Sequence, residues 1–109
     1  MVSGAIANLE KLRGTARDGA LLRYSLGAEY LKAGEVEAAV RELQEAVARD
    51  PGYSAAWKLL GRALEQAGRE REALEAWDRG IEAARARGDR QAEKEMAVFA
   101  KRLQRRLAP

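Results

Sequence analysis

The sequence aligns with itself when it is shifted by thirty-four residues, and this period constrains the fold more than any other feature. The residues that coincide are Leu26 with Leu60, Gly27 with Gly61, Gly34 with Gly68, and Leu43 with Trp77. One unit therefore spans residues 20–53, and the next spans residues 54–87. Repeats of this length each form one small motif that cannot bury its apolar face alone, so we expect a stack of similar motifs.

Each unit divides at a glycine into two stretches whose apolar residues recur at helical spacing. Gly34 and Gly68 suit the left-handed turn that ends a helix, because glycine has no Cβ to clash there. Asp50-Pro51 ends the second helix of the first unit, since proline disfavours helical geometry in the residue before it. The second unit has no such proline, so its second helix is expected to run from about residue 69 to residue 87 and end at Gly88.

Two further glycines, Gly27 and Gly61, lie inside predicted helices, where glycine costs about 1 kcal/mol relative to alanine. A close approach between the two helices of each hairpin would offset that cost, with Ala39 and Ala73 as the small partners. The two tryptophans occupy core positions of the repeat, which favours a structural role for both over ligand binding.

Composition and the flanking segments complete the fold prediction. Ala, Leu, Glu, Arg and Gln dominate over β-branched residues, so the chain is predicted to be all-α. A leading helix is predicted over residues 3–14, ended by Gly14, with Thr15-x-x-Asp18 as a cap into the first unit. A capping helix over residues 88–107 begins at Asp89. Residues 1–109 thus form one domain of about six helices, an antiparallel helix-hairpin solenoid.

Missing residue types exclude most catalytic chemistry. The chain has no histidine and no cysteine, so it has no imidazole base, thiol nucleophile, disulfide or common zinc site. Its glycines punctuate helices and form no phosphate-binding loop. We therefore expect a protein that is not an enzyme and needs no metal or cofactor. No secretory signal or membrane-spanning run is visible, so a cytoplasmic location is expected.

The motif Trp57-x-x-Leu60-Gly61-x-x-Leu64, followed by Ala73, Trp77 and Gly80, resembles the tetratricopeptide repeat. The first unit matches it with Leu26-Gly27-x-x-Tyr30, Ala39, Leu43, Ala46 and Pro51. Two departures are Arg23 in place of the tryptophan and Arg85 in place of the terminal proline. The resemblance implies a small bacterial-type repeat protein that acts as a protein-binding adaptor or scaffold.

In this family the first helices of successive hairpins line a concave groove that holds a peptide or partner segment. The resemblance assigns to that groove Leu21, Tyr24, Ala28, Leu31, Ala55, Lys58, Leu59, Arg62, Glu65 and Met96, with Asp89, Ala92 and Glu93 beside them. Lys58 and Arg62 lie one turn apart and could hold a carboxylate, or they could pair with Glu65 or simply be solvated. Tyr24 could anchor a ligand or pack against the leading helix.

One specialised branch of the family grips chaperone C-termini with a Lys-Asn-Asn-Lys-Arg set of side chains. The matching positions here are Tyr24, Ala28, Leu59, Asp89 and Glu93, and none agrees. We therefore predict no carboxylate clamp for a chaperone tail.

The formal charge of +3 is concentrated at the C-terminus, because residues 88–109 alone sum to +3. Lys101, Arg102, Arg105 and Arg106 are expected to form a basic outer face on the last helix. A solvated cap is the favoured interpretation of this face, and nucleic-acid contact is a less favoured alternative. Self-association is a further alternative to partner binding, so the protein is expected to be a monomer or a weak homodimer.

Overall fold

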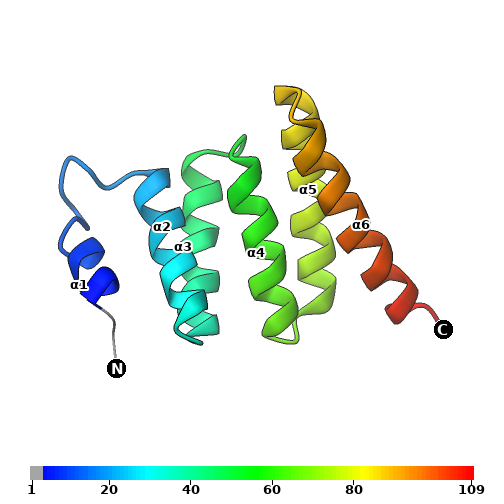
Figure 1. The fold of residues 1–109 in the computed structure, drawn as a ribbon, viewed down its shortest axis with the longest axis horizontal. Coiled ribbons are helices and arrows are strands. Elements are labelled where there is room, and N and C mark those ends of the chain that lie inside the picture. Colours follow the sequence, from blue (N-terminus) through cyan, green and yellow to red (C-terminus); the bar gives the residue numbers. More distant parts are fainter. Residues whose placement is uncertain (1–3) are drawn as a thin grey trace.

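The computed structural model describes residues 4–109, which form six α-helices and no strand (Figure 1). The helices are α1 (Gly4–Glu10), α2 (Ala20–Lys32), α3 (Val36–Arg49), α4 (Ser54–Gln66), α5 (Glu70–Arg87) and α6 (Arg90–Leu107). The prediction of an all-α chain of about six helices is confirmed.

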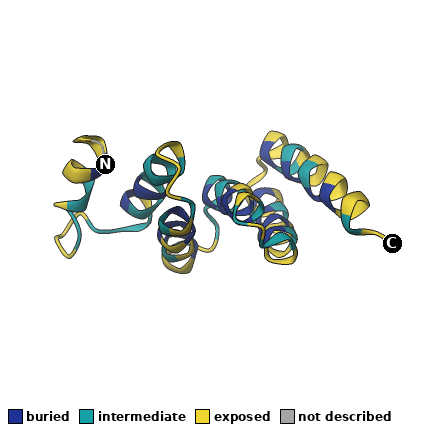
Figure 2. Cartoon of the chain, turned by 90° about the horizontal axis from the view of Figure 1, so that it is seen from below, coloured by how far each residue is buried: buried dark blue, intermediate teal, exposed yellow. Residues whose placement is uncertain are grey.

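The helices stack in sequence order as two antiparallel hairpins between an opening and a closing helix. The first hairpin pairs α2 with α3, and the second pairs α4 with α5 (Figure 1). The hairpins meet mainly where α3 packs on α4, and α6 packs on α5. Each helix turns its buried residues towards its neighbours, so the core runs continuously from the first hairpin to α6 (Figure 2).

The helix ends follow the turn chemistry of the sequence. Gly34 and Gly68 have φ values of 80° and 78°, and Gly88 has a φ of 73°, all in the left-handed region that favours glycine. The longer second helix of the second unit is confirmed, because α5 continues to residue 87. Asp89 caps α6 as expected, accepting a hydrogen bond of 3.1 Å from the backbone N–H of Ala92.

Close approach at the interior glycines is also confirmed, but the facing residues differ from the prediction. The atoms nearest to a Cβ built at Gly27 are those of Leu43, and at Gly61 they are the ring atoms of Trp77. Ala39 and Ala73, the expected partners, are fully buried elsewhere in the same core. Each glycine therefore makes room for the large side chain of its hairpin partner helix.

The opening segment differs most from the prediction. Helix α1 ends at Glu10 instead of continuing to residue 14, and the chain then runs through turns to residue 19. Position 3 lies outside the described residues. Thr15 and Asp18 do not cap α2, because the N-cap is Gly19 and no side chain bonds to it. Ile6 is nevertheless 1% exposed and packs on Leu22 and Leu26, so α1 covers the open face of the first hairpin.

Asp18 instead belongs to a network of ion pairs that ties this segment to the first hairpin. Arg23, which replaces the expected tryptophan, bonds to Asp18 at 2.8 Å and to Glu42 at 3.3 Å. Arg13 reaches the same Glu42. The hydrogen bonds from Arg23 hold the pKa of the Asp18 carboxyl well below its usual range. The network leaves the buried carboxylate of Glu42 with two cationic partners.

Candidate functional site

A shallow depression of about 390 Å³ lies between α2 and α4, the first helices of the two hairpins. Its lining residues are Tyr24, Ala28, Leu31, Lys32, Leu59, Arg62 and Gln66. Five of the residues assigned to the groove from the sequence therefore come together there. Apolar side chains form most of this set, with two cations and one amide.

Arg62 is the cation that remains available in this depression. It is exposed and makes no ion pair or hydrogen bond through its side chain with any residue from 4 to 109. Lys32 pairs with Glu29 at 3.3 Å. Lys58, expected beside Arg62, instead pairs with Glu95 of α6 at 3.2 Å. The expected two-cation site is thus reduced to one free guanidinium.

Several other residues assigned to the groove lie elsewhere. Leu21 is 68% exposed but lies outside the lining of the depression, as does the half-buried Ala55. Glu65 pairs with Arg106 at 3.0 Å. Met96 is fully buried against Gly80, so the prediction that it faces the groove is wrong. Met96 belongs to the apolar stripe of α6, and this stripe is buried where α6 packs on α5.

The residues expected beside the groove at the start of α6 also have structural roles. Asp89 is the helix cap, and Ala92 is 7% exposed. Glu93 pairs with Arg85 of α5 at 3.0 Å.

Tyr24 follows neither of its two expected roles in full. Its ring lies 5.1 Å from that of Tyr53 between centroids, so it packs on the loop before α4 and not on α1. It remains half-buried and lines the depression, which leaves part of the ring accessible.

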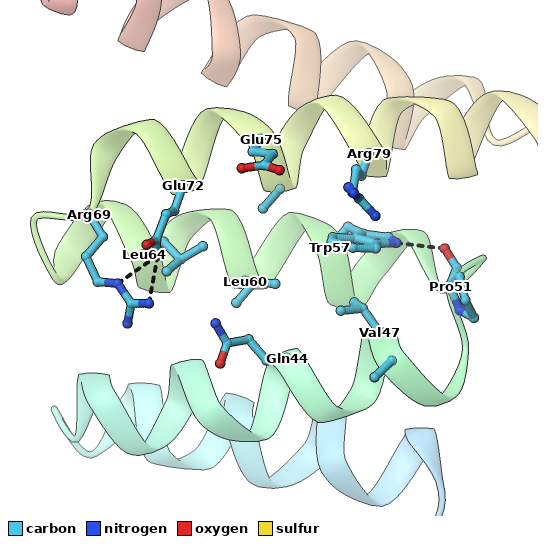
Figure 3. A pocket seen from close by; sticks show the side chains of 12 residues that line it. Gln44, Val47, Pro51, Trp57, Leu60, Leu64, Arg69, Glu72, Glu75 and Arg79 are labelled. Atoms are coloured by element: carbon cyan, nitrogen blue, oxygen red, sulfur yellow. Dashed lines mark hydrogen bonds and ion pairs between the residues drawn. The ribbon is translucent and has the colours of Figure 1, made fainter.

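A second and larger groove of about 600 Å³ lies between α3 and α5, with α4 as its floor (Figure 3). Trp57, Leu60 and Leu64 form the floor, whereas Leu59, Arg62 and Gln66 line the depression described above. At 100° per residue these two sets lie on nearly opposite sides of α4.

This groove was not predicted from the sequence, because Trp57 was assigned to the core. The Trp57 ring is half-buried, with its Nε1–H donating to the carbonyl oxygen of Pro51 at 2.7 Å (Figure 3). The guanidinium of Arg79 lies 5.9 Å from the ring centroid. The available signal was the i, i+3, i+7 stripe of Trp57, Leu60 and Leu64, which is offset from the fully buried stripe of Ala56 and Ala63.

The basic face expected on α6 is present in modified form. Lys101, Arg102 and Arg105 are exposed and, with Val98, surround a surface depression of about 640 Å³. Arg106 also borders it, but its guanidinium bonds to Glu65 and Glu70. Arg106 is therefore exposed beside the other three cations but differs from them in being paired.

Residues 4–109 contain no group of three or more acidic side chains that could hold a metal ion. In the same part of the chain, no helix has the length and apolar character to cross a membrane.

Comparison with known proteins agrees with this geometry. Residues 30–94 match the sequence model of the tetratricopeptide repeat, which covers the second hairpin in full, the first in part, and more than half of the chain. The chain belongs to the tetratricopeptide-repeat family. A TPR repeat-containing protein of Pseudomonas aeruginosa is 50% identical over 100 residues, covering 92% of this chain and 95% of that protein.

Two solved structures show the same arrangement of helices. The solution structure of a Bordetella parapertussis protein is 39% identical and has a TM-score of 0.80, covering 95% of this chain and 90% of that one. The crystal structure of a tetratricopeptide repeat domain protein from Salinibacter ruber is 28% identical, with a TM-score of 0.74, covering 80% of this chain and 97% of that one. Tetratricopeptide-repeat proteins are typically non-enzymatic modules of protein interaction.

Proposed function

We propose that this tetratricopeptide-repeat protein is a cytoplasmic adaptor that holds a peptide or partner segment in the depression between α2 and α4. The observation that carries the proposal is the placement of the unpaired Arg62 beside the accessible parts of Tyr24, Leu31 and Leu59. A free guanidinium can donate two parallel hydrogen bonds to a carboxylate, and the apolar wall can contact an adjacent apolar side chain. The preferred ligand is therefore a segment with an acidic residue next to an apolar one.

Selection from a random peptide library, followed by titration of the selected peptides, tests this preference. We expect the wild-type protein to enrich peptides that combine an acidic and an apolar residue. Arg62→Glu should weaken their binding about tenfold or more, which corresponds to about 1.4 kcal/mol. Arg71→Glu is the matched control, because Arg71 is exposed on α5 and lies outside the lining of the depression. Equal binding by the wild-type protein and Arg62→Glu would contradict the proposal.

The groove between α3 and α5 is the second candidate for the same function. Its larger volume and the fixed Trp57 ring favour it, since aromatic side chains dominate the energetics of protein interfaces. Arg79 is exposed and its guanidinium lies over the Trp57 ring, so Arg79→Glu distinguishes binding in this groove from binding in the depression. Selected peptides that lose affinity for Arg79→Glu, and keep it for Arg62→Glu, would place the ligand in this second groove.

A further inference from the structure

The outer side of α6 carries a row of cations, and the acidic residue beside Arg90 and Lys94, Glu93, is paired with Arg85 of α5. The residues are Arg90, Lys94, Lys101, Arg102 and Arg105, and all are exposed. The steps of four and seven residues from Arg90 to Lys94, Lys101 and Arg105 keep these side chains on one face of the helix. None of the five forms an ion pair within residues 4–109. We call this row the outer basic face.

Charges elsewhere on α6 are neutralised where the helix meets the rest of the protein. Glu93 and Glu95 pair with Arg85 of α5 and Lys58 of α4. In the opposite sense of charge, the cation Arg106 of α6 pairs with Glu65 of α4 and Glu70 of α5. The acidic residues of the helix are thus all used on its flanks, and the outer basic face keeps its full positive charge.

This face has little of what a protein partner would need. Figure 2 shows α6 at the end of the stack, with buried residues on one side and exposed residues on the other. The only large hydrophobic residue exposed on α6 is Val98, at 52%. The cores of protein interfaces are enriched in aromatic residues and depleted in lysine. A surface of cations around one valine fits a polyanion better than a protein.

We propose that the outer basic face binds duplex nucleic acid through its phosphate backbone, without reading bases. Arg90 and Arg105 lie fifteen residues apart, roughly 22 Å along the helix axis. One strand of B-DNA carries roughly six phosphates over that length, which is comparable to the number of cations. Sites for single strands depend on aromatic side chains that stack on bases, and this face has none. A duplex is therefore the favoured ligand.

Fluorescence anisotropy of a labelled 20-base-pair DNA duplex, titrated with the full chain over a series of salt concentrations, tests the proposal. With four to five phosphate contacts, the slope of log K against log salt should be about −4. Affinity should then fall by roughly two orders of magnitude between 50 and 200 mM salt. The double variant Lys101→Gln/Arg105→Gln should bind more weakly and reduce the slope by about two.

The matched control is Arg41→Gln/Arg71→Gln, which removes the same charge from exposed positions on α3 and α5. This control should keep the wild-type slope, and circular dichroism should show that both variants remain folded. The proposal would be overturned by an absence of binding at 50 mM salt or by equal losses in the two double variants. Tighter binding of a single strand of the same length would overturn the preference for a duplex. Tighter binding of polyglutamate would assign the face to an acidic protein segment instead.

Discussion

Alanine at position 61 should destabilise the protein, although alanine is the better helix former. A Cβ at Gly61 would lie less than 3.0 Å from three ring atoms of Trp77, closer than real Cβ atoms approach their neighbours. The ring cannot move aside easily, because Trp77 is 1% exposed and its Nε1–H donates to the carbonyl oxygen of Lys58 at 3.1 Å. The substitution must therefore shift either the indole ring or the two helices.

The expected loss follows from three contributions. Overpacking of a close-packed core costs about 1–3 kcal/mol, and a rigid indole places this site at the upper end. Displacing the ring also breaks its hydrogen bond, which contributes about 1 kcal/mol. The gain in helix propensity from glycine to alanine returns about 1 kcal/mol. The net loss is about 3 kcal/mol, which should lower the Tm by roughly 12–24 °C for a domain of this size.

Thermal unfolding followed by circular dichroism measures this loss, with two internal comparisons. A Cβ at Gly27 would lie 2.5 Å from Cγ and 2.8 Å from Cδ2 of the fully buried Leu43, so Gly27→Ala should also destabilise, by about 1–3 kcal/mol. Gly4→Ala meets nothing within 4 Å and should leave the Tm unchanged. In Gly61→Ala/Trp77→Leu, the combined loss should be smaller than the sum of the two single losses. A Gly61→Ala protein that melts at or above the wild-type temperature would refute the reasoning.

Two further substitutions test the ion-pair network and the helix cap. The hydrogen bonds from Arg23 depress the pKa of Asp18 in the folded state, so this contribution to stability is present near neutral pH and falls as the pH drops below about 4. Asp18→Asn should therefore reduce the difference in unfolding free energy between pH 7 and pH 3, as measured by urea denaturation. Asp89→Ala removes the acceptor for the backbone N–H of Ala92 and should cost about 1 kcal/mol in the same assay at pH 7. An unchanged urea midpoint would show that the cap of α6 is dispensable.

Features that depend on local chemistry were predictable from the sequence. Gly88 marks the end of α5, because the left-handed backbone conformation at this position favours glycine. Asp89 follows as the cap of the next helix. The two hairpins were predictable for the same reason, because a glycine thirty-four residues from its counterpart marks the turn of each one. The end of α1 was not predictable in this way, because a seven-residue helix is held by tertiary packing of residues such as Ile6.

The candidate site was predicted only in part, because ion pairs join residues that are distant in the sequence. Lys58 was expected in the groove, but its partner Glu95 is thirty-seven residues away on a helix whose rotation the sequence leaves open. Met96 lies on the apolar stripe of that same helix, and only packing against Gly80 decides that the stripe faces the core. Arg62 lines the depression, as the repeat pattern led us to expect, because α4 is the first helix of its hairpin and faces α2, the first helix of the other.

The two repeat units differ at a pair of positions, and not only where Arg23 replaces the tryptophan of the repeat pattern. Arg23 corresponds to Trp57 and Glu42 corresponds to Ala76, thirty-four residues apart in both cases. In the second unit Trp57 and Ala76 border the same apolar groove, whereas in the first unit the two positions form an ion pair. A tryptophan at position 23 would remove one of the two cations that hold Glu42, whose side chain is 9% exposed. Because Arg13 would still pair with Glu42, the loss should stay below the cost of about 3–5 kcal/mol for a buried carboxylate left without any partner. Arg23 and Glu42 therefore differ from the second unit as a pair, and with Arg13 they tie the first unit to the opening segment.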